Sequence, residues 1–233
     1  NAEKMILKEI PVLPHGLFNS IDETGQEGEK LVEYIEWLRN RVDELGSAEY
    51  DPVFHVDVYG TIGEIFGPPY DRAEVIEFFS KLNHAASDYP LQVESPIEAS
   101  SRDEQIRVLG ELTDGLAESA VPVDIVADEW CNTYDDITSF VDAGAVDIVQ
   151  VKTPDLGEVT KSIEAVQYCD GTDTAAYLGG SCAETDISAR VSTHLAVATQ
   201  PVQMLAKPGM GVDEGYLIVN NEMTRTLNRL SDA

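Results

Sequence analysis

The chain alternates between short apolar runs and stretches with helical spacing. The clearest helical stripe repeats at steps of three and four, at Leu31, Ile35, Leu38, Val42 and Leu45. Gly46 follows this stripe and predicts its end. Predicted strands lie near residues 5–12, 53–58, 91–94, 122–127, 146–152, 174–178 and 202–206, and further helices near 71–88, 102–118, 134–143, 157–168, 184–198 and 212–230. Strands that alternate with helices predict a parallel sheet with right-handed crossovers.

The number of strand–helix units favours an α/β fold of the TIM-type (β/α) barrel class. Seven units are predicted in the 233 residues, whereas a complete barrel has eight and typically about 250 residues. An open doubly wound sheet is the alternative. The barrel is favoured because residues suited to chemistry follow nearly every strand, not only one crevice. We expect a single domain over residues 1–233, with the first strand–helix unit missing before Asn1.

Three successive apolar runs end in a carboxylate, at Asp57, Glu94 and Asp128. In a parallel barrel these strand ends meet at one face, so the three side chains are expected to converge. Carboxylate oxygens suit Mg²⁺, and no cluster of histidines and cysteines indicates zinc. Glu129 follows Asp128, so the sequence leaves the third ligand open between these two residues.

Lys152 ends the next apolar run, and the alternation of side chains along a strand puts Gln150 on the same face. A lysine in this position is often a surface residue that extends to solvent. A neighbouring cation and partial burial would instead lower the pKa of Lys152 toward working pH, and make it a base. A lysine base combined with Mg²⁺ is a known way to remove a weakly acidic proton beside a carboxylate. The sequence therefore predicts proton abstraction next to a carboxylate.

Two further strand ends carry candidate functional residues. His15 ends the first predicted strand, where it is either structural or a second base. Residues 179–182 (GGSC) follow the sixth strand and are predicted to open a helix, whose N–H groups could bind a substrate carboxylate. An ordinary turn is the alternative for this segment. The remaining histidines are interpreted as packing or surface residues, with the first of them pointing inward: His55, His84 and His194.

The charge of the chain bears on its binding partners and on its cellular environment. Lys and Arg number 15 and Asp and Glu number 43, so the net charge is −28. Such a surface repels nucleic acid and an anionic membrane, and no run reaches the roughly 20 apolar residues of a membrane helix. The acids are spread through the apolar pattern rather than gathered in a disordered tail. This distribution predicts a protein adapted to a salt-rich cytoplasm. The three cysteines, which show no pairing or metal-ligand spacing, also fit a reducing cytoplasm: Cys131, Cys169 and Cys182.

Six segments resemble the methylaspartate ammonia-lyase family of the enolase superfamily, in a halophilic, haloarchaeal form. They are residues 12–16 (VLPHG), 55–60 (HVDVYG), 128–132 (DEWCN), 152–157 (KTPDLG), 179–185 (GGSCAET) and 207–215 (KPGMGVDEG). The resemblance covers the C-terminal barrel portion of such proteins. Their N-terminal capping domain and first barrel strand have no counterpart in the sequence.

The resemblance implies a reaction and a set of residue roles. Lys152 would take the C3 proton of L-threo-3-methylaspartate, the (2S,3S) form, and ammonia would leave to give mesaconate. His15 would be the base for the other C3 epimer. Mg²⁺ ligands are implied at Asp57, Glu94 and Asp128, the last in preference to Glu129. Substrate contacts are implied at Gln150, Ser181, Cys182 and Leu205.

The resemblance also implies a homodimer in glutamate metabolism, acting on a small amino-acid substrate, with K⁺ as an activating ion. Two alternatives remain open from the residues. One is another enolase-superfamily reaction on the same lysine and Mg²⁺, such as dehydration or racemisation. The other is a non-catalytic barrel subunit that needs a partner chain.

Overall fold

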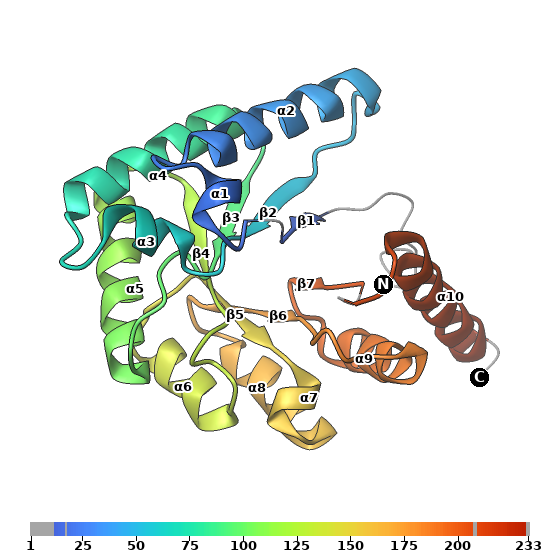
Figure 1. Cartoon of the computed structure of the whole chain (residues 1–233). Coiled ribbons are helices and arrows are strands. Elements are labelled where there is room, and N and C mark those ends of the chain that lie inside the picture. Colours follow the sequence, from blue (N-terminus) through green and yellow to red (C-terminus); the bar gives the residue numbers. More distant parts are fainter. Residues whose placement is uncertain (1–11, 17, 207–208, 232–233) are drawn as a thin grey trace. The chain divides into compact units, whose positions relative to one another are not determined.

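The computed structural model describes residues 12–16, 18–206 and 209–231, and it describes side chains at residues 12–13, 16, 18–206 and 209–230 (Figure 1). They form two compact units. The N-terminal unit comprises residues 12–130 and 142–147, and the C-terminal unit comprises residues 131–141 and 148–231. The single domain over residues 1–233 stays a prediction.

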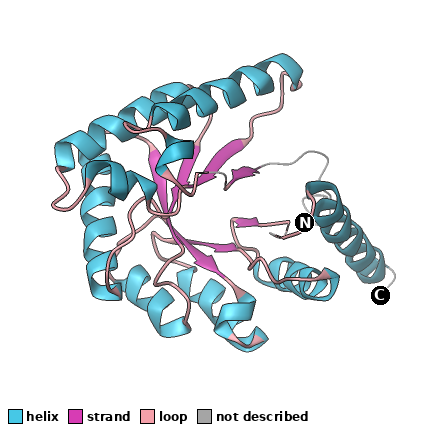
Figure 2. Ribbon diagram, viewed as in Figure 1, coloured by secondary structure: helices cyan, strands magenta, loops and turns pink. Residues whose placement is uncertain are grey.

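Four parallel strands in chain order form the sheet of the N-terminal unit: β1 (Val12–His15), β2 (Val53–Asp57), β3 (Leu91–Glu94) and β4 (Val123–Ala127). Its helices are α1 (Ile21–Thr24), α2 (Glu29–Leu45), α3 (Thr61–Phe66), α4 (Arg72–Ala86) and α5 (Arg102–Glu118). Helix α4 packs between α2 and α5, and the three run along the sheet (Figure 2). Each strand is joined to the next through helix, as the alternating pattern predicts.

The apolar stripe of α2 is buried as predicted, at Leu31, Ile35, Leu38 and Val42. The helix ends at Gly46, whose N–H donates to the carbonyl of Val42 over 2.7 Å. In β2, the buried Phe54 and Val56 alternate with His55 and Asp57, so the two pairs lie on opposite faces of the sheet. One face of the sheet therefore joins the apolar core, and the other carries polar side chains.

Three parallel strands form the sheet of the C-terminal unit: β5 (Ile148–Val151), β6 (Ala175–Leu178) and β7 (Gln203–Met204). Its helices are α6 (Tyr134–Asp142), α7 (Thr153–Leu156), α8 (Val159–Cys169), α9 (Asp186–Thr199) and α10 (Val212–Ser231). Helix α8 packs on β5, β6 and α9, and α10 packs on α9. The buried β5 and β6 are almost entirely apolar apart from Gln150, which stands out as a polar residue inside a strand.

The predicted elements agree closely with the described ones where the periodicity is long. Helix α5 has the predicted bounds, and the other long helices differ from them by a few residues. The short helices α1, α3 and α7 were not predicted. The strand predicted over 5–12 lies almost wholly outside the described residues, and the described strand β1 begins at Val12. Among the described helices, none has the length and apolar character required to cross a membrane.

Candidate functional site

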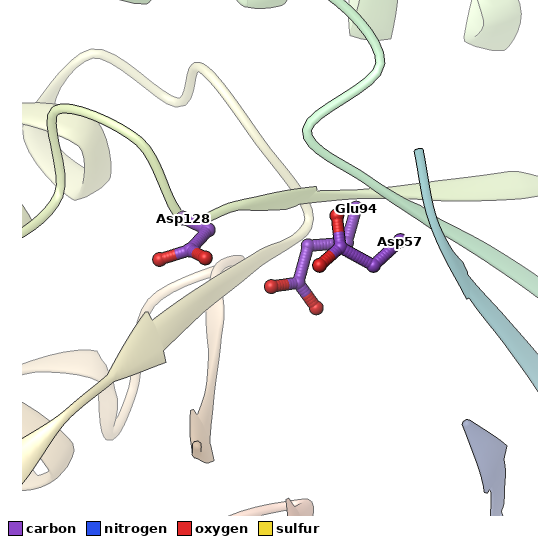
Figure 3. Close-up of side chains that lie close together, drawn as sticks. All are labelled: Asp57, Glu94 and Asp128. Atoms are coloured by element: carbon purple, nitrogen blue, oxygen red, sulfur yellow. The ribbon is translucent and has the colours of Figure 1, made fainter. Parts of the chain in front are cut away.

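Three carboxylates of the N-terminal unit lie close together at the ends of successive strands (Figure 3). One oxygen from each of Asp57, Glu94 and Asp128 lies within 4.8 Å of the others. Asp57 and Glu94 are register partners across β2 and β3. Glu94 pairs with Val126 of β4, and Asp128 follows two positions later on the same face. Parallel register therefore accounts for the carboxylate triad, as we name this group.

Mutual repulsion and burial act on the carboxylate triad. Glu94 is 2% exposed and Asp128 is 8% exposed. Burial, followed by the charges of Glu94 and Asp128, raises the pKa of Asp57 to about 7. A divalent cation would offset this repulsion, and a donor set made only of carboxylate oxygens suits a hard cation such as Mg²⁺. The residues present therefore fit the ion that the sequence predicts.

Glu129, the alternative third ligand, is engaged elsewhere. Its Oε2 accepts a hydrogen bond from the Ser95 hydroxyl over 3.3 Å. Asp128, and not Glu129, belongs to the group of carboxylates that could hold a metal ion. The geometry thus favours Asp128 of the two residues that the strand pattern left open.

His55 contacts the carboxylate triad directly. Its ring is buried, with Nε2 2.5 Å from Oε2 of Glu94 and Nδ1 3.0 Å from Oε1 of Gln92. The sequence interpretation of His55 as an inward-pointing packing residue gave the direction but missed these polar contacts. A signal was available, because His55 and Gln92 each precede a triad residue by two positions and so share its face.

Each triad residue is followed closely by a non-glycine residue in the left-handed region of backbone space. The φ angles are 47° at Tyr59, 49° at Ser95 and 61° at Trp130. Such angles are uncommon outside glycine, and they concentrate at functional sites. Trp130 is held in place by its indole N–H, which donates to the carbonyl of Ala99 over 3.0 Å. The chain therefore turns sharply just beyond the end of each ligand-bearing strand.

The residues predicted around the lysine lie in the C-terminal unit. Gln150 is buried on β5, and the half-buried Lys152 follows the strand with extended backbone, as the N-cap residue of α7. The strand thus ends at Val151, one residue earlier than predicted. A Cβ atom at Gly179 would lie 2.3 Å from Oε1 of Gln150, so the glutamine side chain lies directly against the Gly179 backbone.

The segment 179–182 does not open a helix, contrary to the prediction. Helix α9 begins only at Asp186, where Thr185 and Ser188 form a capping box that fixes its start. Ser181 is half-buried and Cys182 is exposed in the preceding loop. The N–H groups at the start of α9 therefore lie several residues after Gly179 and Gly180 in the chain, and not at the glycines as predicted.

The other predicted site residues have simple positions. His15 is the last residue of β1, as predicted, and its side chain lies outside the described part of the chain. Leu205 is half-buried just after β7. His84 is exposed on α4, as expected of a surface residue. His194 is also exposed, and its Nε2 lies 2.7 Å from Oε1 of the buried Glu222 on α10.

Comparison with known proteins gives consistent matches along the chain. The family model described as methylaspartate ammonia-lyase C-terminus matches residues 1–232. Methylaspartate ammonia-lyase of Haloarcula marismortui is 59% identical over 229 residues, which cover 98% of this chain and 54% of that protein. The corresponding enzyme of Citrobacter amalonaticus is 49% identical over 228 residues, covering 97% of this chain and 55% of that protein. The chain thus spans about half the length of the curated relatives that it matches.

Solved structures give the same picture. The Mg complex of β-methylaspartase from Clostridium tetanomorphum matches with a TM-score of 0.91 at 44% identity, covering 99% of this chain and 56% of that one. The C. amalonaticus methylaspartate ammonia-lyase structure that contains (2S,3S)-3-methylaspartic acid matches with a TM-score of 0.92 at 49% identity, covering 99% and 56%. Muconate lactonizing enzyme from Pseudomonas putida shares the fold alone, with a TM-score of 0.54 at 18% identity over 83% of this chain and 45% of that one. These matches confirm the predicted fold class, a TIM-type (β/α) barrel of the enolase superfamily.

Proposed function

Because the chain belongs to the methylaspartate ammonia-lyase family, we propose that the protein is a carbon–nitrogen lyase that converts L-threo-3-methylaspartate to mesaconate and ammonia. The observation that carries this proposal is the carboxylate triad, with one oxygen of each residue within 4.8 Å of the others. The (2S,3S)-3-methylaspartic acid in the C. amalonaticus structure supports the choice of substrate. The reaction breaks the C3–H and C2–N bonds and forms the C2=C3 double bond, so atoms and electrons balance.

The carboxylate triad is proposed to hold Mg²⁺ through Asp57, Glu94 and Asp128. The C. tetanomorphum relative was solved as a Mg complex, which supports this choice of ion. When bound, a divalent cation supplies positive charge next to the substrate carboxylate, where negative charge grows as the C3 proton leaves.

Lys152 is proposed to take the C3 proton of the (2S,3S) substrate, and His15 the C3 proton of the other epimer. Lys152 is only half-buried. Its backbone lies just past the end of β5, so the strand fixes the point from which its long side chain extends. Gln150 shares its strand and is proposed to bind the substrate. Further substrate contacts are proposed at Ser181, Cys182 and Leu205.

The setting proposed for the protein is a salt-rich cytoplasm, in which it serves glutamate metabolism. The net charge of −28 supports the adaptation to salt. A homodimer activated by K⁺ is proposed from the family resemblance. A small amino-acid substrate, rather than nucleic acid or a membrane, fits so acidic a chain.

A second candidate is another enolase-type reaction, such as dehydration or racemisation of a carboxylate substrate. The observation that favours it is a match to muconate cycloisomerase 1 of Rhodococcus opacus, 33% identical over 129 residues. That match covers 55% of this chain, so it carries less weight than the lyase matches. A non-catalytic subunit is the remaining alternative.

The deciding experiment is product analysis. The full protein is incubated with (2S,3S)-3-methylaspartate, Mg²⁺ and concentrated KCl, and mesaconate and ammonia are quantified separately by chromatography and by a coupled assay. Equal amounts of the two products support the lyase. If no mesaconate forms, and the protein instead turns over a hydroxy acid or interconverts epimers, the lyase is contradicted and the second candidate is supported. If none of these substrates is turned over, the non-catalytic subunit is supported.

A further inference from the structure

We propose that His55 is a positioning residue that fixes the orientation of the metal ligand Glu94, and that Gln92 in turn fixes His55. The proposal rests on the metal site of the proposed function. It assigns a role to two buried polar side chains that do not themselves belong to the carboxylate triad.

The sheet register brings His55 to Glu94. His55 stands opposite Gln92, and Asp57 stands opposite Glu94, across the parallel pair β2 and β3. His55 therefore reaches Gln92 directly and Glu94 diagonally, with one ring nitrogen on each. Nε2 of His55 lies 2.5 Å from Oε2 of Glu94, a hydrogen-bond distance between two buried side chains. This contact fixes one carboxylate oxygen of Glu94 beside the other triad residues.

The orientation of the His55 ring is set at its other end by Gln92. Asp124 stands opposite Gln92 across β3 and β4, on the same face of the sheet. Oε1 of Gln92 faces Nδ1 of His55 at 3.0 Å, and an amide oxygen only accepts hydrogen bonds. Nδ1 of His55 therefore donates a hydrogen bond to Oε1 of Gln92. The hydrogen bonds run from Gln92 through His55 to Glu94.

The burial of His55, Gln92 and Glu94 indicates that their hydrogen bonds fix the geometry of the metal ligand and do not only fill space. His55 is 3% exposed, Gln92 6% and Glu94 2%. Polar groups removed from water to this extent cost free energy unless they are hydrogen-bonded, and a fully bonded set is rigid. Hydrogen-bond partners of metal ligands fix ligand geometry, and their loss commonly weakens metal affinity by about 10- to 100-fold. A histidine that served packing alone would affect stability and leave metal affinity unchanged.

The test measures Mg²⁺ affinity by titration calorimetry on the full protein, at one fixed high KCl concentration. His55→Leu keeps the volume and removes both hydrogen bonds, and we expect its Kd for Mg²⁺ to rise by about 10- to 100-fold. Gln92→Leu leaves His55 in place but unanchored, and we expect a smaller rise. His55→Gln keeps an N–H donor near the position of Nε2, and its Kd should lie closer to wild type than that of His55→Leu.

His84→Leu is the matched control, because His84 is exposed on α4 and should leave the Kd unchanged. An unchanged Kd in both folded leucine variants at positions 55 and 92 would overturn the proposal. If His55→Leu does not fold, Gln92→Leu decides alone, and an unchanged Kd in that variant overturns the proposal. Wild-type protein that binds no Mg²⁺ would also overturn it. Since calorimetry needs no turnover, a protein that binds Mg²⁺ as described but forms no mesaconate would refute the lyase and leave the role of His55 standing.

Discussion

Asp57 and Glu94 stand opposite each other as the last residues of β2 and β3, paired by the parallel register of the two strands. Two carboxylates so placed, one half-buried and one buried, repel each other unless a cation lies between them. Asp57→Asn should therefore remove the rise in melting temperature that Mg²⁺ gives the wild type, and should leave the metal-free protein no less stable. For wild type, Mg²⁺ at 100 times its Kd should stabilise by about 2.7 kcal/mol.

Thermal unfolding with and without a chelator checks this effect. Asp51→Asn, at an exposed aspartate before β2, is the control and should respond to Mg²⁺ as wild type does. An equal Mg²⁺-induced shift in Asp57→Asn would remove Asp57 from the ligand set.

Substitution of the proposed base should affect one substrate epimer. Lys152→Ala is expected to lower kcat for (2S,3S)-3-methylaspartate by about 10²- to 10⁴-fold, because proton transfer loses its acceptor. Mg²⁺ affinity should not change. His15→Ala should spare this substrate and impair the other C3 epimer, and Lys81→Ala, at an exposed lysine on α4, should spare both. Steady-state kinetics on the two epimers gives the answer, and undiminished turnover by Lys152→Ala would exclude that lysine as the base.

Gly179→Ala should displace the side chain of Gln150. The new Cβ would lie 2.3 Å from Oε1 and 2.4 Å from Cδ of Gln150, too close for contact. The glutamine end is flexible, so we expect it to move while the fold persists, and KM to rise by about tenfold, equivalent to about 1.4 kcal/mol of binding. Gly110→Ala on α5 is the control, since its Cβ would meet nothing nearer than 3.7 Å. Kinetic constants equal to wild type in Gly179→Ala would show that substrate binding does not depend on the present position of the Gln150 side chain.

Glu222 should make stability depend on pH. A hydrogen bond from Arg225, followed by the contact with His194, lowers the pKa of Glu222 while burial opposes the change. Because the folded pKa is depressed, the stabilisation is fully present above the unfolded value of about 4.3, and is lost as pH falls through the folded value. Glu222→Gln should cost about 1 kcal/mol at neutral pH, since both partners are about half exposed. The cost should vanish in acid.

Urea unfolding of wild type and Glu222→Gln across this pH range, at constant salt, measures that difference. Glu214→Gln, at an exposed glutamate on the same helix, should show little effect at any pH. A deficit that persists unchanged below the pKa of Glu222 would mean that the side chain acts through packing rather than charge.

Salt should stabilise the protein strongly. A net charge of −28 produces self-repulsion that is screened as the Debye length falls from about 10 Å at 0.1 M salt to about 3 Å at 1 M. The free energy of unfolding should therefore rise steeply with KCl in chemical denaturation. Tetramethylammonium chloride in place of KCl separates general screening from a requirement for K⁺. Stability that is flat over this range would contradict the halophilic assignment.

Long-range periodicity made much of the fold predictable. Helix α5 has the predicted bounds, because its apolar spacing agrees with its serine cap. The carboxylate triad was predictable because the carboxyl ends of parallel strands meet, and Asp57, Glu94 and Asp128 each end an apolar run. The sequence could not choose between Asp128 and Glu129, since that choice depends on where the chain turns after β4 and on the Ser95 hydroxyl.

Contacts that depend on register or on short local hydrogen bonds were missed. The link from His55 to Glu94 exists only because β2 and β3 pair in one particular register, which a single sequence does not specify. The start of α9 was predicted too early because the glycines at 179 and 180 resemble a turn from a strand directly into a helix. The capping box of Thr185 and Ser188 determines the actual start. One-turn helices such as α7 have too few residues for periodicity to detect.

The left-handed backbone at Tyr59, Ser95 and Trp130 has a consequence for how this protein can evolve or be engineered. Each such residue costs about 1 kcal/mol or more relative to an unstrained conformation, so selection for stability alone would favour glycine at all three. Glycine would also loosen the turns that follow the three ligands. Redesign guided by stability alone is therefore expected to recommend glycine at these three positions, where it would most disturb the ligand-bearing turns. At the strained turns, stability and activity place opposite demands on the sequence.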